Sequence, residues 1–295
     1  MPLSSAVSSP RRTPNPSAEG FDVAVKHVYL IGIGGCGMAG MARMLAARGA
    51  VVSGSDLARS ETTDALTAEG IRIGFDQSRA WLPGQDEGGC DLVVASAAIK
   101  PDHPQMLEAQ RRGIPTLMYA EALGKCMNGR TGIAVAGTHG KSTTTAMLGA
   151  ALTDAGLDPT VIVGATCAQL GAGCLTPSGP GVGFRLGSEV IPRGDWQGRP
   201  GVLVAEACEF NRSFHNYRPV LASISSVEAD HLDVYGTFDE VIRAFHQFAE
   251  QVVPRWACND ASTQAAYDAL IREVGPSVVM THSQSGAFGF TAALH

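Results

Sequence analysis

Residues 135–145 place an apolar run, two glycines, a lysine, hydroxyl side chains and the start of a helical pattern in immediate succession. The apolar run 133–136 leads into this segment as a buried strand would. Gly137 and Gly140 allow a tight turn and a close approach of the backbone to an anion. The helix that follows would direct free N–H groups and a partial positive charge at the turn. The segment therefore predicts a strand–loop–helix unit that binds phosphate.

Two side chains indicate that the bound phosphate belongs to a nucleotide. Lys141 supplies a point charge for the terminal phosphates, and Ser142 supplies a hydroxyl that can hold magnesium. The spacing G-x-x-G-K-S-T differs from the commonest phosphate loop, which has a glycine where Val135 stands. The alternative is a plain glycine turn before an ordinary helix, with Lys141 solvated. At His139 we expect the backbone N–H to be more useful than the ring. The predicted nucleotide-binding residues are Gly137, Thr138, His139, Gly140, Lys141, Ser142 and Thr143.

A second glycine-rich loop lies near the start of the chain. Gly32, Gly34 and Gly37 have the G-x-G-x-x-G spacing, after a predicted strand at 27–31 and before a helical pattern. Asp56 follows at nearly the distance of a ribose-binding acid. The pattern favours a pyrophosphate-containing ligand, of which NAD or FAD is only one class. The alternative is a strand-to-helix turn whose glycines serve packing.

Strands and helices alternate along the first part of the chain. This rhythm is typical of a parallel sheet with helices on its faces. We therefore predict an α/β protein, with a Rossmann-like N-terminal domain followed by a phosphate-loop α/β central domain. The predicted strands are 27–31, 50–56, 71–73, 91–95 and a strand from 114, and the predicted helices are 38–49, 61–69 and 105–112.

The second half repeats the alternation after the turn signal Asn128-Gly129. Residues 164–201 are rich in glycine and proline and are predicted to form long loops. The helix after the phosphate loop should end at Gly156 and bury one apolar face, made of Met147, Leu148, Ala151, Leu152 and Ala155. The other predicted elements are strands at 202–205 and 220–224, a helix at 238–250, a strand near Trp256, a helix at 263–273 and a strand at 278–280.

Length and composition fit two globular domains. The chain has 295 residues, of which 45% are apolar and 17% charged. We expect a disordered tail at 1–25, a Rossmann-like domain at 26–126 and a nucleotide-binding domain at 130–295. The tail is rich in Ser, Pro and Arg but lacks the apolar stretch of a signal peptide.

Charge and cysteine content exclude several classes of partner. The net charge is −6 and no basic block occurs, which argues against nucleic acid as the main partner. The cysteines number seven and none has C-x-x-C spacing, so we expect a reducing cytoplasm without a disulfide framework or a cysteine zinc site. No apolar stretch is long enough to cross a bilayer. The sequence leaves the oligomeric state open.

Two further residues are candidates for metal binding. Glu206 stands where a predicted strand ends, and His231 follows the next predicted strand. Ligands bind at this edge of α/β sheets, so Glu206, His231 and Ser142 could together coordinate magnesium. The alternatives are a solvated glutamate and a structural histidine. Asp230 and Asp233 fit caps or turns as well as ligands.

Several segments together resemble the Mur ligase family. The resemblance covers roughly residues 26–290, and the segments occur in the family's order. It is closest to the members that join L-alanine to UDP-N-acetylmuramate, because of the glycine-rich start. The segments that carry it are 27–38 (HVYLIGIGGCGM), 53–56 (SGSD), 136–144 (AGTHGKSTT), 185–188 (RLGS), 205–207 (AEA) and 227–236 (VEADHLDVYG).

The resemblance implies an ATP-dependent amide ligase of peptidoglycan synthesis, which uses ATP and Mg2+. The lactyl carboxylate of UDP-N-acetylmuramate would be phosphorylated, and the amine of L-alanine would attack the acyl phosphate. By resemblance, Lys141 stabilises the β- and γ-phosphates, Ser142 binds magnesium, and Glu206 and His231 serve magnesium near the γ-phosphate. These three, Lys141, Glu206 and His231, are the implied catalytic residues. The residues implied for the UDP-sugar are Gly32, Gly34, Gly35, Gly37, Ser55 and Asp56.

The chain departs from the family pattern at three places. Apart from Glu209, neutral and basic residues stand at 207–212 where the family has an acidic run, and Ser225-Ser226 replace Thr-Asn. The family also carries a C-terminal domain that closes over ATP and holds the amino acid, and we expect the chain to end within the central domain. Two alternatives therefore stay open: a non-catalytic module that binds UDP-sugar and ATP, and a NAD-binding Rossmann protein.

Overall fold

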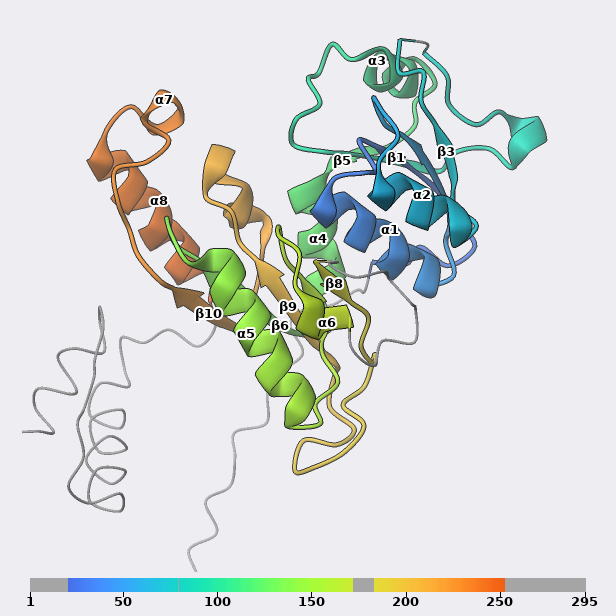
Figure 1. Cartoon of the computed structure of the whole chain (residues 1–295). Coiled ribbons are helices and arrows are strands. Elements are labelled where there is room, and N and C mark those ends of the chain that lie inside the picture. The colour runs from blue at the N-terminus through green and yellow to red at the C-terminus, as the bar shows by residue number, and fades with distance from the viewer. Residues whose placement is uncertain (1–20, 79, 172–182, 253–295) are drawn as a thin grey trace, which may run out of the picture.

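A computed structural model describes residues 21–78, 80–171 and 183–252. These residues form two five-stranded sheets, each flanked by helices (Figure 1). Both sheets are parallel apart from the edge strand β8, so the structure confirms the predicted α/β class. No helix within the described ranges is both long enough and apolar enough to cross a membrane.

The first sheet has the strand order β3-β2-β1-β4-β5, and all of its pairs are parallel. The chain crosses over at the centre of this sheet, between β1 and β4, next to the first glycine loop. Ligands bind at such switch points in open α/β sheets. Its strands are β1 (His27–Ile31), β2 (Val51–Ser55), β3 (Arg72–Gly74), β4 (Leu92–Ala95) and β5 (Thr116–Met118).

Alternating residues of β1 and β4 face opposite sides of the sheet, as the two-residue period of a strand requires. Val28 and Leu30 pack on the side of α1, whereas Tyr29 and Ile31 pack on the side of α3. Sequence analysis predicted helices α1 to α3 within a few residues of their observed limits. The helices of this part are α1 (Cys36–Ala47), α2 (Glu61–Ala68), α3 (Pro104–Arg111) and α4 (Tyr119–Met127), with a 3-10 turn η1 (Gln85–Glu87).

Helix α4 was not predicted from the sequence, because Gly124 suggested a break in the pattern. Glu121 starts this helix by accepting a hydrogen bond from the backbone N–H of Met118, at 2.7 Å. Gly124 is needed for packing: a Cβ there would lie 2.2 Å from the carbonyl oxygen of Asn216. The predicted domain boundary at 126–130 falls at the end of α4 and stays a prediction.

The second sheet has the strand order β10-β6-β9-β7-β8, and only the β7–β8 pair is antiparallel. Sequence analysis predicted β6, β9 and β10 but missed β7, and it predicted only loops where β8 lies. The described strands are β6 (Thr131–Ala136), β7 (Thr160–Ile162), β8 (Phe184–Arg185), β9 (Val202–Glu206) and β10 (Leu221–Ile224).

The helices of this part are α5 (Lys141–Asp154), α6 (Ala168–Gly171), α7 (Leu232–Tyr235) and α8 (Phe238–Glu250), with a 3-10 segment η2 (Phe210–Asn216). Helix α8 has its predicted limits, and Thr237 caps it by accepting the N–H of Glu240. The strands and helix predicted beyond residue 252 lie outside the described residues.

The buried face predicted for α5 was only partly correct: Leu148 and Leu152 pack against an apolar cluster, but the other three residues are exposed. Met147 is 67% exposed, and Ala151 and Ala155 are also exposed. The helix instead approaches the sheet through Gly149, where a Cβ would lie 2.9 Å from the Val161 side chain. Because helix and strand approach closely at this glycine, the small residues Thr145 and Gly149 face the sheet. The spacing of apolar residues in the sequence does not reveal such an approach.

One apolar cluster spans both sheets, and a smaller cluster lies on the other face of each sheet. A single cluster joins Leu30 of the first sheet to Ala134 and Leu203 of the second. Helix α1 contributes to the junction at Gly40, where a Cβ would lie 3.0 Å from the ring of Phe184 in β8. Helix α4 packs against η2 in the same region, so a packed interface joins the two sheets.

The buried ring of His27 predicts a pH-dependent loss of stability. Burial lowers the pKa of His27 from 6.5, and the ring is hydrogen-bonded to Ser53 Oγ at 2.7 Å. Below pH 6.5 the unfolded chain therefore binds more protons than the folded chain. Stability from the neutral ring is complete above pH 6.5 and is lost as pH falls toward the lowered pKa. In urea unfolding between pH 7.5 and 5, His27→Gln should show a flatter acid-side decline than the unmodified chain.

His246, which is exposed on α8, provides the control. The variant His246→Gln should keep the acid-side decline of the unmodified chain. An unchanged slope in His27→Gln would contradict the assignment of this pH dependence to the buried ring.

Candidate functional site

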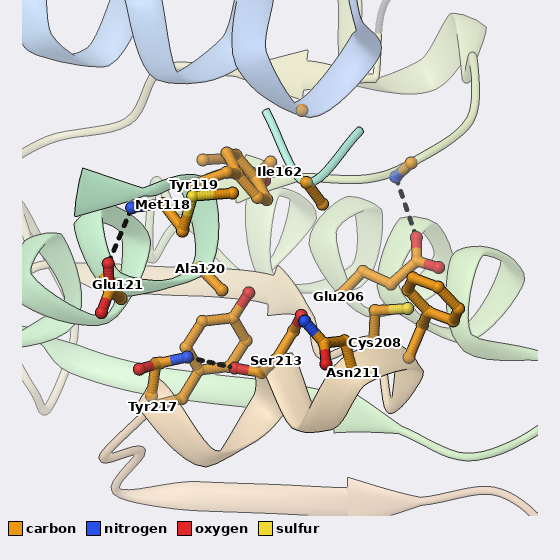
Figure 2. A pocket seen from close by; sticks show the side chains of 15 residues that line it. Met118, Tyr119, Ala120, Glu121, Ile162, Glu206, Cys208, Asn211, Ser213 and Tyr217 are labelled. Atoms are coloured by element: carbon orange, nitrogen blue, oxygen red, sulfur yellow. Dashed lines mark hydrogen bonds between the residues drawn. The ribbon is translucent and has the colours of Figure 1, made fainter. Parts of the chain in front are cut away.

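A cavity of about 510 Å³ lies between the two sheets, at the ends of their strands. Figure 2 shows Met118 and Tyr119 from the first part of the chain on one side and Glu206, Cys208 and Asn211 on the other. Gly37 of the first glycine loop also lines this cavity. The cavity therefore connects the first glycine loop with the metal-binding candidate at the end of β9.

The phosphate loop connects β6 to α5 and has the predicted strand–loop–helix form. Gly137 has φ +133° and Gly140 has φ +81°, backbone conformations that suit glycine. The first hydrogen bond of α5 runs from the N–H of Thr144 to the carbonyl of Gly140. The N–H groups of Lys141, Ser142 and Thr143 precede that bond, so the helix itself leaves them without an acceptor. Such a set of N–H groups is an anion-binding site.

The loop after β10 holds the phosphate loop from the side. Ser226 accepts the N–H of Thr138 on its carbonyl at 2.9 Å and the N–H of His139 on its hydroxyl at 3.0 Å. Ser225 Oγ donates to the carbonyl of His139. The expectation that the His139 N–H would serve phosphate was therefore wrong for this conformation, because Ser226 already accepts that proton. The His139 ring is largely exposed, 3.5 Å from Glu228.

Lys141 is folded back into its own loop. Its Nζ donates to the carbonyls of Gly137 at 2.6 Å and Thr138 at 3.0 Å. It also lies 3.1 Å from Oε1 and 2.9 Å from Oε2 of Glu209. The Lys141 side chain is 14% exposed and that of Glu209 is 2% exposed. The solvated lysine of the plain-turn alternative is therefore absent from this conformation.

Ser142 and Glu206 meet at the end of β9. Ser142 Oγ lies 3.1 Å and 3.0 Å from the two carboxylate oxygens, and Glu206 Oε2 also accepts the N–H of Gly164 at 2.8 Å. Adjacent ligands of an octahedral Mg2+ are about 2.9 Å apart, because each lies about 2.05 Å from the ion. The spacing and the oxygen chemistry of this pair therefore fit magnesium.

His231 lies in a left-handed backbone conformation, with φ +51°, directly before α7. Its Nε2 is 3.9 Å from Glu209 Oε1 and 4.0 Å from Asp230 Oδ2, and its ring contacts Phe210 edge-on. One ligand atom from each of Glu209, Asp230 and His231 lies within 4.8 Å of the others. Among the described residues, no hydrogen bond or ion pair joins His231 to Glu206, so their service to one metal stays a prediction.

Glu209 was not among the predicted site residues. It follows β9 in an irregular segment where Asn211 and Arg212 both have positive φ values. Tyr235 donates its hydroxyl proton to the Glu209 carbonyl, and Arg212 pairs with Glu240 at 3.4 Å. No strand or helix period marks residue 209 as buried. Its lone negative charge among neutral neighbours was the only sequence signal.

Asp56 holds the first glycine loop in place, and sequence analysis predicted that Asp56 lies close to this loop. Asp56 Oδ2 accepts the N–H of Gly34 at 2.7 Å, and a Cβ at residue 34 would lie 2.9 Å from the same oxygen. Gly32 donates its N–H to the carbonyl of Ser55 at 2.8 Å, and Gly35 stands directly before α1. The loop is thus fixed against the end of β2.

The Ser55 side chain makes its hydrogen bonds within the protein, and its role in substrate binding stays a prediction. Ser55 is 1% exposed, and its hydroxyl donates to Gln105 Oε1 at 2.7 Å and accepts from Gln77 Nε2 at 3.1 Å. Burial in this polar network engages the hydroxyl with the two glutamines. Ser55 instead supports the glycine loop through its backbone carbonyl.

Tyr119 is a further cavity residue that sequence analysis missed. A Cβ on Gly37 would lie 2.6 Å from the Tyr119 hydroxyl, so this glycine makes room for the ring. Burial, with the charge of Glu206 as a second cause, raises the pKa of Tyr119 well above its ordinary value. Tyr119 therefore keeps its proton and can donate a hydrogen bond inside the cavity. Tyr119 could not be found from the sequence, because it begins helix α4, which was not predicted.

Two family descriptions match the chain. The Mur ligase family catalytic domain matches residues 27–131, and the Mur ligase middle domain matches residues 135–287. The first match contains the Gly32–Gly37 loop, and the second contains the phosphate loop, Glu206 and His231. A dehydrogenase hypothesis explains only the first loop.

Curated relatives agree with this family. UDP-N-acetylmuramate–L-alanine ligase of Kineococcus radiotolerans is 43% identical over 242 residues, or 81% of this chain and 46% of the relative. The enzyme of the same name from Mycobacterium bovis is 39% identical over 276 residues, or 92% of this chain and 51% of the relative. The chain thus spans about half the length of these relatives.

Solved structures show the same architecture. UDP-N-acetylmuramate–alanine ligase from Thermotoga maritima has a TM-score of 0.62 at 26% identity and covers 77% of this chain and 47% of its own. UDP-N-acetylmuramate:L-alanyl-gamma-D-glutamyl-meso-diaminopimelate ligase from Neisseria meningitides has a TM-score of 0.64 at 29% identity, covering 79% and 70%. Both similarities confirm the predicted order of the two α/β units.

Residues 225–226 pack directly against Gly137, so a methyl group at position 137 should strongly weaken nucleotide binding. In Gly137→Ala, the Cβ would lie 2.1 Å from Ser225 Oγ and 2.9 Å from two backbone nitrogens. The loop after β10 would have to move and release the phosphate loop. We expect the affinity for MgATP, measured by calorimetry, to fall at least about tenfold, or about 1.4 kcal/mol.

Gly129→Ala is the matched control. Gly129 also has a positive φ, +76°, but nothing lies within 4 Å of its added Cβ. This variant also places an alanine at a positive φ, yet it should keep its MgATP affinity within about twofold. Equal losses in the two variants would show that contact with residues 225–226 is unimportant.

Proposed function

Because the chain belongs to the Mur ligase family, we propose that it binds UDP-N-acetylmuramate and MgATP and serves the ATP-dependent addition of L-alanine to that sugar nucleotide. The observation that carries the proposal is the cavity that joins Gly37 of the first glycine loop to Glu206 beside the phosphate loop. The lactyl carboxylate of a sugar nucleotide bound at the first glycine loop would then face the terminal phosphate of ATP bound at the phosphate loop. The reaction belongs to peptidoglycan precursor synthesis, and we place it in the cytoplasm.

The chemistry explains why two anion sites are needed. A carboxylate is a poor electrophile, and phosphorylation by ATP gives it a good leaving group. The amine of L-alanine then attacks the acyl phosphate, forming the amide and releasing phosphate, with ADP as the other product. The protein must hold two anions close together and in line, which requires positive charge and fixed N–H groups between them.

The phosphate loop would provide this environment. The free N–H groups of Lys141, Ser142 and Thr143 face the position of the phosphates, and Lys141 adds charge once its side chain extends. Ser142 and Glu206 would hold Mg2+, with His231 near the γ-phosphate, and the ion would neutralise charge on the phosphate oxygens. Tyr119 would donate a hydrogen bond from the opposite wall of the cavity.

The first glycine loop would receive the diphosphate of the sugar nucleotide. Gly32, Gly34, Gly35 and Gly37 bring backbone close to that group, at the start of α1. Asp56 holds Gly34 in place and lies on the side where the uridine would extend. The sugar and its lactyl carboxylate would then reach toward Glu206 through the cavity.

A binding module without catalysis is the second candidate function, the alternative that sequence analysis left open. Incubation with UDP-N-acetylmuramate, MgATP and L-alanine separates the two candidates. If the chain is catalytic, mass spectrometry should show the alanyl adduct with stoichiometric ADP. Binding of both nucleotides by calorimetry without adduct would favour the module, and binding of neither would contradict both.

Lys141→Ala tests the separation of the two anion sites. The two glycine loops lie on different sheets, so the loss of this charge should affect only one ligand. We expect MgATP affinity to fall about tenfold or more, with UDP-N-acetylmuramate affinity unchanged within about twofold. Lys125→Ala, which removes an exposed charge from α4, should change neither affinity. Equal weakening of both ligands in a folded Lys141→Ala variant would refute the division.

A further inference from the structure

We propose that Glu209 is a positioning residue that holds Lys141 in a retracted, phosphate-incompetent position and releases it when a divalent cation arrives with the nucleotide. This inference rests on the proposed function, because it concerns how the same site becomes able to bind ATP. Phosphate binding by a phosphate loop does not require a buried carboxylate paired with the lysine of the loop. The structure nevertheless shows that arrangement.

All three hydrogens of the Lys141 ammonium group are engaged. Two are donated to the carbonyls of Gly137 and Thr138, at 2.6 Å and 3.0 Å, and the third is directed to Glu209 Oε1 at 3.1 Å. An ammonium group has only three donors and no acceptor. A phosphate oxygen can therefore bind Nζ only if one of these partners is lost.

Glu209 is the partner with the strongest hold on the lysine. Its side chain is 2% exposed, and its Oε2 lies 2.9 Å from Nζ. In a site of low polarity, such a charged hydrogen bond is stronger than the two bonds to neutral carbonyls. The backbone of Glu209 is itself fixed, since its carbonyl accepts the Tyr235 hydroxyl and the N–H of Arg212. The main chain that carries the carboxylate is thus held in place beside the phosphate loop.

The Glu209 carboxylate also lies close to two other possible metal ligands, His231 and Asp230. Glu209 Oε1 lies 3.9 Å from His231 Nε2, on the side where Asp230 also lies. The three side chains can offer one ligand atom each within 4.8 Å. A divalent cation at this position would satisfy the negative charge of Glu209, and Lys141 would become free to turn to phosphate. Cation and nucleotide would then strengthen each other's binding.

Chemical labelling of amines tests the retracted state directly. The chain has four lysines, of which Lys26, Lys100 and Lys125 are exposed and serve as internal standards. With an acetylating reagent and peptide mapping, Lys141 of the ligand-free chain should react at least about tenfold more slowly than these three. In Glu209→Gln, its relative rate should rise toward theirs. Equal rates for all four lysines in the unmodified chain would overturn the proposal without any variant.

Nucleotide affinity tests the consequence, and its sign distinguishes restraint from support. If Glu209 restrains Lys141, ATP in EDTA should bind Glu209→Gln about five- to tenfold more tightly than the unmodified chain. With saturating Mg2+ this advantage should vanish or reverse, because the variant has lost a cation ligand. A merely structural role predicts weaker binding under both conditions, and that result would refute restraint.

Glu228→Gln is the matched control for charge. Glu228 belongs to the same loop region, is 60% exposed at its side chain and lies 3.5 Å from His139, without contacting Lys141. Equal tightening in both variants would assign the effect to general repulsion of ATP and would overturn the proposal. If the unmodified chain does not bind MgATP at all, the proposed nucleotide site is refuted. If it binds MgATP normally and Glu209→Gln has the same ATP affinity in EDTA as the unmodified chain, only the restraint by Glu209 is refuted.

Discussion

The parallel pairing of β10, β6 and β9 is the constraint on which the site depends. Its register places Ile224 beside Ala136 and Glu206 beside Val135. Three strands therefore end at one edge, and the residues that follow them, Ser225, Gly137 and Ala207, start the loops that form the site. Because carboxyl ends of parallel strands meet, chemistry separated by almost a hundred residues is gathered without a long connecting segment.

The junction between the sheets gives the site its second half. Helices α1 and α4 pack toward the second sheet through glycines, at Gly40 against Phe184 and at Gly124 against Asn216. This packing brings the first glycine loop to the cavity that ends at Glu206. Under the proposed function, the two glycine loops on different sheets would serve one reaction centre, as transfer between two bound anions requires.

Two of the three departures from the family pattern acquire a physical role in the structure. Ser225 and Ser226 use their hydroxyls to hold the phosphate loop at His139. At 207–212 the chain keeps one acid, Glu209, and buries it against Lys141. Loss of neighbouring negative charges leaves Glu209 as the only carboxylate that contacts the lysine among the described residues.

The sequence by itself determined most strands and helices, the two glycine loops and the residues at the strand ends, because these follow from local periodicity and turn chemistry. Only the tertiary structure decided the inward side of α5, the helix α4 with Tyr119, the burial of Ser55 and the pairing of Lys141 with Glu209. That pair is 68 residues apart in the chain, and the His139–Ser226 bond spans 87. Such contacts depend on strand order and on close approaches at glycines, neither of which leaves a local signal in the sequence.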